Sequence, residues 1–358
     1  MFPDPPARAL PGGTSAKLES LLEAWVADGN GVGVTAAVVT SEGTWAGAAG
    51  VDGAGVRLVP DAAMAIASMT KTFVAAEVMD LARRGLVDLD APVTNYVKLP
   101  FDAGGATVRE LLAMRSGFPV DPFEEAFDAA ADDLDRRWTA SDVLALVDED
   151  GARQGSRGGA PEYSNLNFLV LGSVVEKVSG QPLALTLRRD LIDPAHLDRV
   201  WVQDRERPQA PLSVAVENPD LPTVDADGPW LPSRSVASAA GAAGGMAADA
   251  PSLARWGYML YGGRVIDSRL VAQMTAGGPD DWYGLGTERL TADGAQAYGH
   301  DGDIGSYHGL FLVWPDQATS IAVMEPAPAR LPVDVETTLE GLMDKLHRAS
   351  SEAAGAAG

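Results

Sequence analysis

The N-terminal part of the chain changes from a helical to a strand pattern of hydrophobic positions. Apolar residues recur at helical spacing from about residue 15 to 28, which predicts an amphipathic helix. The apolar runs at residues 32–40 and 44–51, separated by Ser41-Glu42-Gly43, predict two strands joined by a turn. This part is therefore expected to be a helix followed by a β-hairpin.

The C-terminal part shows the same elements in the opposite order. Strands are predicted at Tyr307–Trp314 and Thr319–Met324, around a turn at Pro315-Asp316, and a helix is predicted at Val333–Arg348. Hairpins at both ends of the chain favour one shared antiparallel sheet that is flanked by helices. The expected fold class is therefore mixed α/β, of the α+β type.

The middle of the chain differs from both ends. Between about residues 89 and 235 the patterns are mostly helical, with joints rich in proline and glycine. We therefore expect a discontinuous α/β lobe, residues 1–88 and 236–349, around a mostly helical lobe, residues 89–235. The tail at residues 350–358, rich in alanine and glycine, is expected to be disordered.

One predicted helix carries a candidate nucleophile at its start. The segment Met69–Arg84 has helical periodicity and stops at Gly85, so Ser68 and Lys71 lie three residues apart on one face. The positive end of the helix dipole and burial both disfavour a charged Lys71. A neutral lysine can take the proton of Ser68 and make the serine nucleophilic. The alternative is a helix cap beside a solvated lysine, because so short a motif also occurs by chance.

Two further polar motifs follow along the chain. Tyr163 and Asn165 lie at the end of a loop that contains glycine and proline, just before a helix predicted at Asn167–Val178. Functional polar groups commonly lie in such loops. The third motif, His300-Asp301-Gly302, is predicted to form a turn that enters a strand, and its glycine allows a ligand to approach the backbone. We expect the three motifs to meet in a cleft between the lobes.

Charge and composition exclude several classes of function. The net charge of −23 over 358 residues argues against nucleic acid and anionic membranes as partners. The chain has no cysteine, and His196 and His347 lack ligand-like spacing, so we expect neither a metal nor another cofactor. No secretory signal and no apolar run long enough to span a membrane is visible, so the expected location is the cytoplasm.

The motifs SMTK at residues 68–71, YSN at 163–165 and HDG at 300–302 resemble those of the penicillin-recognising serine hydrolases. Within that family the chain is similar to class C β-lactamases, D-alanyl-D-alanine carboxypeptidases and related serine esterases, and the similarity extends from about residue 20 to 325. The resemblance implies a β-lactamase/transpeptidase-like fold. A KTG sequence is common as the third motif, whereas HDG is similar to the peptidase and esterase branch, which leaves the substrate class open.

Three residues are expected to carry the chemistry. Ser68 attacks a carbonyl carbon, and Lys71 and Tyr163 share the proton that the serine loses. A tyrosine with polar or cationic neighbours can have a lowered pKa, so we expect Tyr163 to take part in proton transfer.

Four more residues are expected to bind or position the substrate. Asn165 holds the catalytic lysine or a substrate amide by hydrogen bonds. His300 is expected to face the cleft and to bond the substrate or the tyrosine hydroxyl; a structural histidine bonded to the backbone is the alternative. The resemblance implies an oxyanion site made by the backbone N–H groups of Ser68 and Asp303, next to Gly302.

These residues predict a serine hydrolase that acts on a small-molecule ester or amide through an acyl-enzyme on Ser68. An amine or alcohol acceptor could resolve the same intermediate, so an acyltransferase remains an alternative, as does a D-alanyl-D-alanine carboxypeptidase. The intact motifs argue against a catalytically silent binding module.

The negative charges of Asp301 and Asp303 favour neutral substrates over substrates that carry a carboxylate beside the scissile bond. Trp230 and Trp282 are candidates for lining the acyl pocket.

Overall fold

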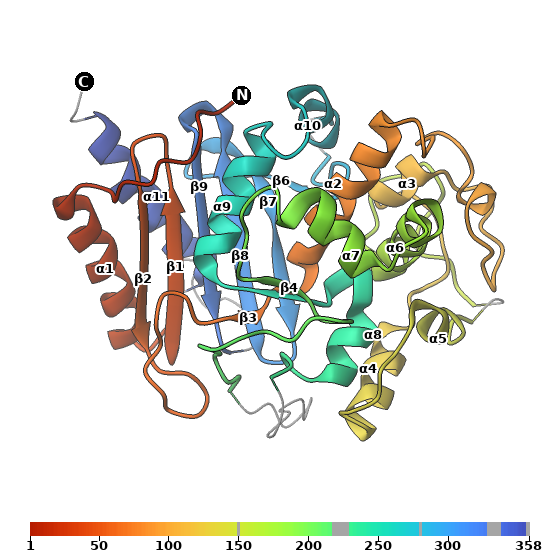
Figure 1. The fold of residues 1–358 in the computed structure, drawn as a ribbon, viewed down its shortest axis with the longest axis horizontal. Coiled ribbons are helices and arrows are strands. Elements are labelled where there is room, and N and C mark those ends of the chain that lie inside the picture. The colour runs from red at the N-terminus through yellow and green to blue at the C-terminus, as the bar shows by residue number, and fades with distance from the viewer. Residues whose placement is uncertain (149–150, 217–228, 279–280, 328–337, 356–358) are drawn as a thin grey trace.

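A six-stranded antiparallel sheet lies at the centre of the molecule, with the strand order β2-β1-β9-β8-β7-β6 (Figure 1). The computed structural model describes residues 1–148, 151–216, 229–278, 281–327 and 338–355. The strands of the sheet are β1 (Gly33–Val39), β2 (Thr44–Gly50), β6 (Glu288–Ala292), β7 (Ala295–Ile304), β8 (Tyr307–Trp314) and β9 (Thr319–Glu325). Because β1 pairs with both β2 and β9, for example Ala37 with Ala322, the two ends of the chain share one sheet, as the sequence predicts.

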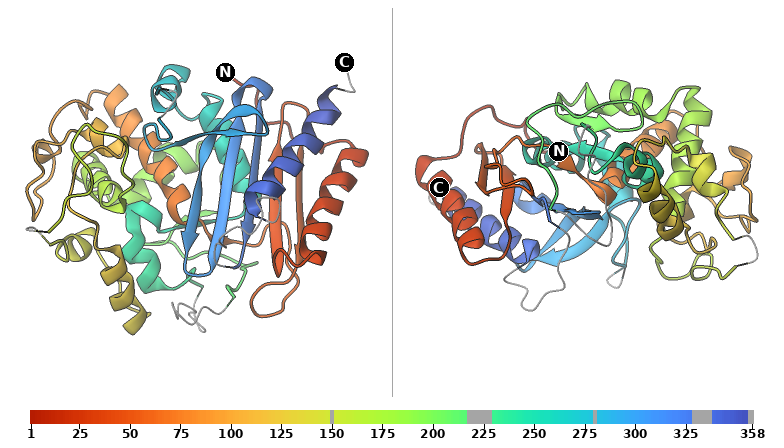
Figure 2. Two further views of the ribbon diagram at one scale, coloured as in Figure 1. Left: turned by 180° about the vertical axis from the view of Figure 1, so that it is seen from behind. Right: turned by 90° about the horizontal axis from the view of Figure 1, so that it is seen from below.

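Helices cover both faces of this sheet. The helices α1 (Gly12–Ala27) and α11 (Leu339–Gly355) pack on one face, and α9 (Ala250–Tyr261) packs on the other (Figure 2). Alternate residues of β1 therefore enter two different cores, the first with Val34 and Val38 and the second with Ala37. Burial on both faces explains why this strand is a continuous apolar run rather than an alternating one.

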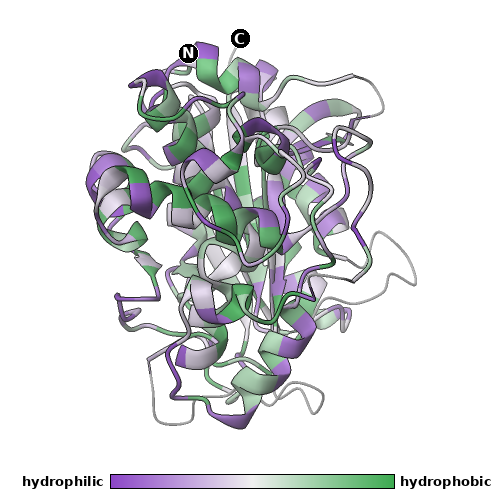
Figure 3. Ribbon diagram, turned by 90° about the vertical axis from the view of Figure 1, so that its right-hand side faces the viewer, coloured by the Kyte–Doolittle hydropathy of each residue, from purple (hydrophilic) through white to green (hydrophobic). Residues whose placement is uncertain are grey.

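The remaining helices form a layer beside the sheet, where hydrophobic and hydrophilic residues alternate around the helices (Figure 3). The helix α6 (Asn165–Ser179) is mostly buried. Among the described residues, no single helix is long and apolar enough to span a membrane. The helix α6 and the following helical segment at residues 183–192 are long and apolar enough when they are taken together, but the chain bends by 73° between them. The elements of this region are α2 (Thr70–Arg83), α3 (Val108–Leu112), α4 (Phe123–Asp132), α5 (Ala140–Leu144), α6 (Asn165–Ser179), α7 (Leu183–Leu187), α8 (Arg234–Gly244), α10 (Ser268–Met274) and a small sheet of β3 (Met64–Ala65), β5 (Met246–Ala248) and β4 (Val200–Val202).

The C-terminal helix differs from its predicted bounds. Residues 333–337 of the predicted helix lie outside the described residues, and α11 continues through residue 355, into the tail that was expected to be disordered. Polar contacts support this extension, because His347 and Ser351 both hydrogen-bond the Oε1 atom of Gln317, at 2.8 and 2.9 Å. Residues 356–358 of the tail lie outside the described part of the chain.

Candidate active site

Ser68 lies in a tight turn between the small sheet and α2. A short 3₁₀ turn, Ala67–Met69, precedes the helix, and Ala67 has a φ of 44°. A residue with a side chain rarely adopts this left-handed conformation, which is found mainly where surrounding structure enforces it. The turn therefore holds Ser68 in a defined position at the helix start.

The strand β7 touches this turn through Gly302. A Cβ atom on Gly302 would clash with the carbonyl oxygen of Ile66 and would lie 3.1 Å from the backbone nitrogen of Ser68. Only glycine allows the strand to lie so close. The third motif thus lies against the backbone of the first, although the sequence prediction differs in one respect: His300, Asp301 and Gly302 are inside β7, and the turn comes later, between β7 and β8.

The side chains of Ser68, Lys71 and Tyr163 form one hydrogen-bonded group. The Oγ atom of Ser68 lies 2.8 Å from Lys71 Nζ and 2.6 Å from the Tyr163 hydroxyl. The same Nζ atom lies 2.8 Å from Asn165 Oδ1 and 2.6 Å from the carbonyl oxygen of Ala243. The structure thus brings together four of the residues that the sequence predicts from distant segments.

The number of donors on Lys71 defines the direction of these hydrogen bonds. The oxygens of Asn165 and Ala243 can only accept, so they take both N–H donors of a neutral lysine amine. In this neutral form the lone pair of the amine faces Ser68, whose hydroxyl donates to it, whereas in the ammonium form Nζ donates to Ser68 Oγ. The Tyr163 hydroxyl donates to the same Oγ atom. With a neutral Lys71, the serine proton therefore points toward the lysine nitrogen.

Burial sets the protonation states of both partners. It lowers the pKa of Lys71 from its ordinary value of 10.5 to about 7, against the opposing charges of Asp121, Asp301 and Glu288. Burial also raises the pKa of Tyr163 well above its usual range. The expected lowering of the tyrosine pKa is therefore wrong, because loss of solvent outweighs the hydrogen bond to the serine. Of these two residues, Lys71 is the one whose pKa lies near neutral pH.

Asp121 positions the second motif and was not predicted from the sequence. Its Oδ2 atom accepts a hydrogen bond from the backbone nitrogen of Asn165, at 2.9 Å, while Ser164 makes no side-chain cap. Asp121 thus caps α6 and orients the residue that holds Lys71. No local pattern could have identified it, because the two residues are 44 positions apart.

His300 is fully buried, and its bond to a backbone carbonyl agrees with the structural alternative rather than with the expected bond to the Tyr163 hydroxyl. Its Nδ1 atom lies 2.7 Å from the carbonyl oxygen of Asp301, so this nitrogen carries a proton, and its Nε2 atom lies 3.0 Å from the Tyr283 hydroxyl. The ring of Tyr283 packs against both His300 and Tyr163. The expected bond from the histidine to the Tyr163 hydroxyl is replaced by this contact through Tyr283.

A cluster of acidic groups surrounds this histidine. Glu288, from β6, lies 3.4 Å from His300 Nδ1, and the carboxylate of Asp301 lies 3.6 Å from it. Burial and the charge of Asp301 raise the pKa of Glu288 to about 7. Partial loss of solvent opposes ionisation of Asp301, whose side chain is still 58% exposed, but its hydrogen bond with His300 and the charge of His300 lower its pKa to about 2.

The same trio is of the type that binds metal ions, since its ligand atoms lie within 4.8 Å of one another. However, the Nδ1 atom of His300, which faces the carboxylates, is protonated and donates a hydrogen bond to the carbonyl oxygen of Asp301. A metal would have to displace that proton. The trio is therefore arranged as a hydrogen-bonded acidic cluster, and the charges of Asp301 and Glu288 act on Lys71.

Aromatic rings form another wall of the site. The ring centroid of Trp282 lies 6.4 Å from that of Tyr163, and Trp282 is 41% exposed. Trp230, the other predicted pocket residue, instead contacts the guanidinium groups of Arg207 and Arg234. Of the two tryptophans, only Trp282 packs beside Tyr163.

Comparison with known proteins gives the family. A family model described as Beta-lactamase matches residues 18–334 of the chain. The chain belongs to the beta-lactamase family. This match confirms the resemblance inferred from the three motifs, and the family comprises serine hydrolases that include amidases.

Solved structures of the beta-lactamase fold agree with this assignment. D-amino acid amidase from Ochrobactrum anthropi SV3 superposes with a TM-score of 0.79 at 23% identity, covering 95% of this chain and 99% of that one. D-stereospecific amidohydrolase from Streptomyces sp. superposes with a TM-score of 0.75 at 28% identity, covering 91% and 98%. Among curated relatives, Protein flp from Staphylococcus aureus (strain N315) is 29% identical over 147 residues, 40% of this chain. The match spans only 28% of the length of that relative.

A mutation of Gly302 tests the contact between the motifs. We expect Gly302→Ala to lower kcat/KM by roughly 10²-fold, because the added Cβ must push the Ser68 turn away from its position. Steady-state kinetics measures the loss. Gly13→Ala is the matched control, since a Cβ at Gly13 meets no atom within 4 Å. Full activity of Gly302→Ala would show that the close approach of β7 does not matter for catalysis.

Proposed function

We propose that the chain is a serine hydrolase that cleaves small-molecule amides or esters through an acyl-enzyme on Ser68. The observation that carries the proposal is the position of Ser68 Oγ, 2.8 Å from a buried lysine amine and 2.6 Å from the hydroxyl of Tyr163. A lysine with a pKa of about 7 is neutral often enough to serve as the base. The predicted roles of Ser68, Lys71 and Tyr163 fit this geometry.

In the proposed reaction, Lys71 takes the proton of Ser68 while Oγ bonds to the substrate carbonyl carbon. The bond to the leaving group then breaks; Tyr163 gives its proton to the leaving nitrogen or oxygen and receives the proton held by Lys71. In the second half, water loses a proton along the same path and attacks the ester of Ser68. The acid product leaves, and the serine regains its hydrogen.

The developing oxyanion needs fixed donors, and we assign this role to the backbone N–H groups of Ser68 and Asp303. The register of β7 supports the assignment. Within the described sheet, β6 pairs only with residues 295–299 of β7, whereas residues 300–304 pair with β8 alone. The segment around Asp303 thus extends beyond β6, beside the Ser68 turn that Gly302 contacts.

Charge points to the kind of substrate. Asp121, Asp301 and Glu288 all favour positive charge at Lys71, so the cleft attracts an ammonium group and repels a carboxylate. Neighbouring structures of D-amino acid amidase are complexes with L-phenylalanine amide and D-phenylalanine. We therefore propose amides or esters of amino acids, with Trp282 beside the acyl side chain, and we assign Asn165 to hold Lys71.

A matched substrate series tests this proposal. We expect kcat/KM to fall in the order phenylalanine amide, 3-phenylpropionamide, and an analogue with a carboxylate in place of the ammonium group. Each step is expected to cost roughly fivefold to tenfold at low salt, and less at high salt, because screening weakens exposed charges. Asp301→Asn should reduce the differences in kcat/KM between these substrates, because the Asp301 side chain is 58% exposed and its charge can act on a bound substrate.

The control is Asp28→Asn, at the exposed end of α1 on the other side of the sheet. This substitution changes the net charge by the same amount as Asp301→Asn, and it should leave the order of kcat/KM values among the substrates unchanged. If the carboxylate analogue is the best substrate and Asp301→Asn has no effect, the carboxypeptidase alternative replaces this proposal.

A further inference from the structure

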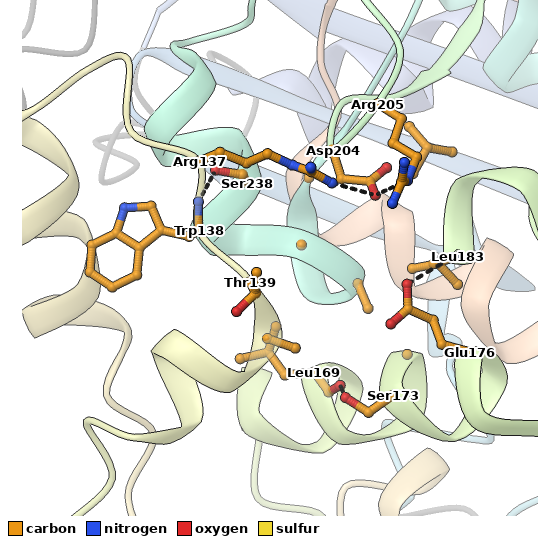
Figure 4. A pocket seen from close by; sticks show the side chains of 16 residues that line it. Arg137, Trp138, Thr139, Leu169, Ser173, Glu176, Leu183, Asp204, Arg205 and Ser238 are labelled. Carbon is orange, nitrogen blue, oxygen red and sulfur yellow. Dashed lines mark hydrogen bonds and ion pairs between the residues drawn. The ribbon is translucent and has the colours of Figure 1, made fainter. Parts of the chain in front are cut away.

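A cavity of about 210 Å³ lies between α5, α6 and α8, in the helical layer (Figure 4). None of the proposed catalytic residues lines it. Its inner wall is apolar, formed by residues such as Leu169, Leu183 and Val202, whereas its outer part carries charged side chains. A cavity of ~150 Å³ already holds benzene, so this one has room for a compact organic molecule.

The charged part of the cavity contains an unsatisfied acceptor. The Oδ1 atom of Asp204 is buried and has no hydrogen-bond partner among the described residues. Its Oδ2 atom lies 3.7 Å from an Arg137 nitrogen and 3.5 Å from Arg205 Nε, both too long for a good hydrogen bond. Because Oδ1 has almost no accessible surface, a bound donor can reach this carboxylate only at Oδ2, whose two long contacts leave it able to accept a further hydrogen bond.

The two arginines supply the opposite charge. Arg137 and Arg205 have side chains that are 40% and 45% exposed, and both line the same cavity as Asp204 (Figure 4). Each guanidinium group has five N–H donors and can bind a carboxylate in addition to its contact with Asp204. The cavity thus presents two guanidinium groups and two carboxylates, Asp204 and Glu176, beside an apolar wall, and one oxygen of Glu176 already accepts from the backbone nitrogen of Leu183.

We propose that this cavity is a second binding site, for a free amino acid with an apolar side chain. The ammonium group would donate to Asp204 Oδ2, the carboxylate would bind Arg137 and Arg205, and the side chain would pack on Leu169 and Leu183. A ligand that has an ammonium group but no carboxylate would be repelled by the positive charges of the two arginines. A ligand with a carboxylate alone would leave the Asp204 acceptor unsatisfied.

The position of the cavity links it to the catalytic lysine. The segment α8 lines the cavity with Gly241 and Ala242, and the next residue, Ala243, accepts a hydrogen bond from Lys71. The helix is kinked at Gly241, which has non-helical backbone angles. The other wall, α6, begins at Asn165, which also binds Lys71. A bound amino acid therefore contacts both elements that hold the catalytic base.

Calorimetric titration of protein whose Ser68 has been blocked with a phosphonate tests the proposal. We expect leucine, as at least one of its two enantiomers, to bind saturably with one site per chain. Isoamylamine and 4-methylpentanoate lack one charge each and should bind at least about tenfold more weakly, the loss that follows from removing a charged hydrogen bond. Absence of saturable binding by either enantiomer, or equal binding of the analogues, would overturn the proposal.

Variants locate the binding. Asp204→Asn and Arg205→Gln should each weaken leucine binding about tenfold or more, and Ser173→Leu should abolish it by filling the cavity. Arg207→Gln is the control, because Arg207 is exposed but does not line the cavity. Thermal unfolding verifies that each variant is folded. Unchanged binding in all three cavity variants, or binding only when Ser68 is unblocked, would assign the heat to another site and refute the proposal.

Discussion

Replacing Ser68 with alanine is expected to lower kcat/KM for amide and ester substrates by on the order of 10⁴–10⁶-fold. The reason is that no acyl-enzyme can form, although the buried lysine, the tyrosine and the cleft remain. Initial rates with phenylalanine amide measure the loss. In the unaltered protein, a p-nitrophenyl ester or a phosphonate is expected to add its mass to the peptide that contains Ser68.

The matched control for this substitution is Ser20→Ala. Ser20 is exposed on α1, where its hydroxyl donates to the backbone carbonyl of Ala16 in its own helix. Its removal should leave both the rate and the adduct unchanged. An adduct on another residue, or full turnover by Ser68→Ala, would remove Ser68 from the mechanism.

Replacing Lys71 with alanine is expected to lower kcat/KM by roughly 10²–10⁴-fold, the usual cost of losing a general base. The pH profile identifies the group. With a pKa of about 7, Lys71 is an ammonium ion below that pH and a neutral amine above it. Activity should therefore rise with pH through about 7 and then level off, whereas a solvated lysine would place the rise near its ordinary pKa of 10.5. In Lys71→Ala this rise should disappear.

Two substitutions test whether the rise in the pH profile belongs to Lys71 or to another residue. Tyr163→Phe should slow the reaction but leave the rise near the same pH, because burial raises the tyrosine pKa and the phenol does not titrate there. Lys177→Ala, at the exposed end of α6, should change neither rate nor profile. A profile whose rise persists without Lys71 would assign the base to another group, with Glu288 as the first alternative because its pKa is about 7 as well.

Local patterns were sufficient to predict the elements that carry the first two motifs. The helix that follows Ser68 was predicted at Met69–Arg84 and begins at Thr70, and the helix after the second motif was predicted to begin at Asn167 and begins at Asn165. The two hairpins were also predicted nearly to the residue. Periodicity and turn residues act over a few positions, so the sequence contains this information directly.

Contacts between distant segments could not be predicted in this way. The carbonyl of Ala243 binds Lys71 across 172 positions, and any residue type could have supplied that oxygen. Glu288 joins His300 because β6 pairs with β7, a register that only the folded sheet defines. The prediction of a turn at His300 failed for a related reason, since Gly302 is needed for close approach to Ser68 rather than for a turn.

The order of strands in the central sheet has a consequence for the newly synthesised chain. The strand β1 lies between β2 and β9, so the first hairpin leaves the ribosome long before its second neighbour has been made. Until then its unpaired edge can join other chains, which makes early release hazardous. The contact of Gly302 with the Ser68 turn also forms late. A polypeptide that terminates prematurely therefore lacks both a closed sheet and the contact that positions Ser68.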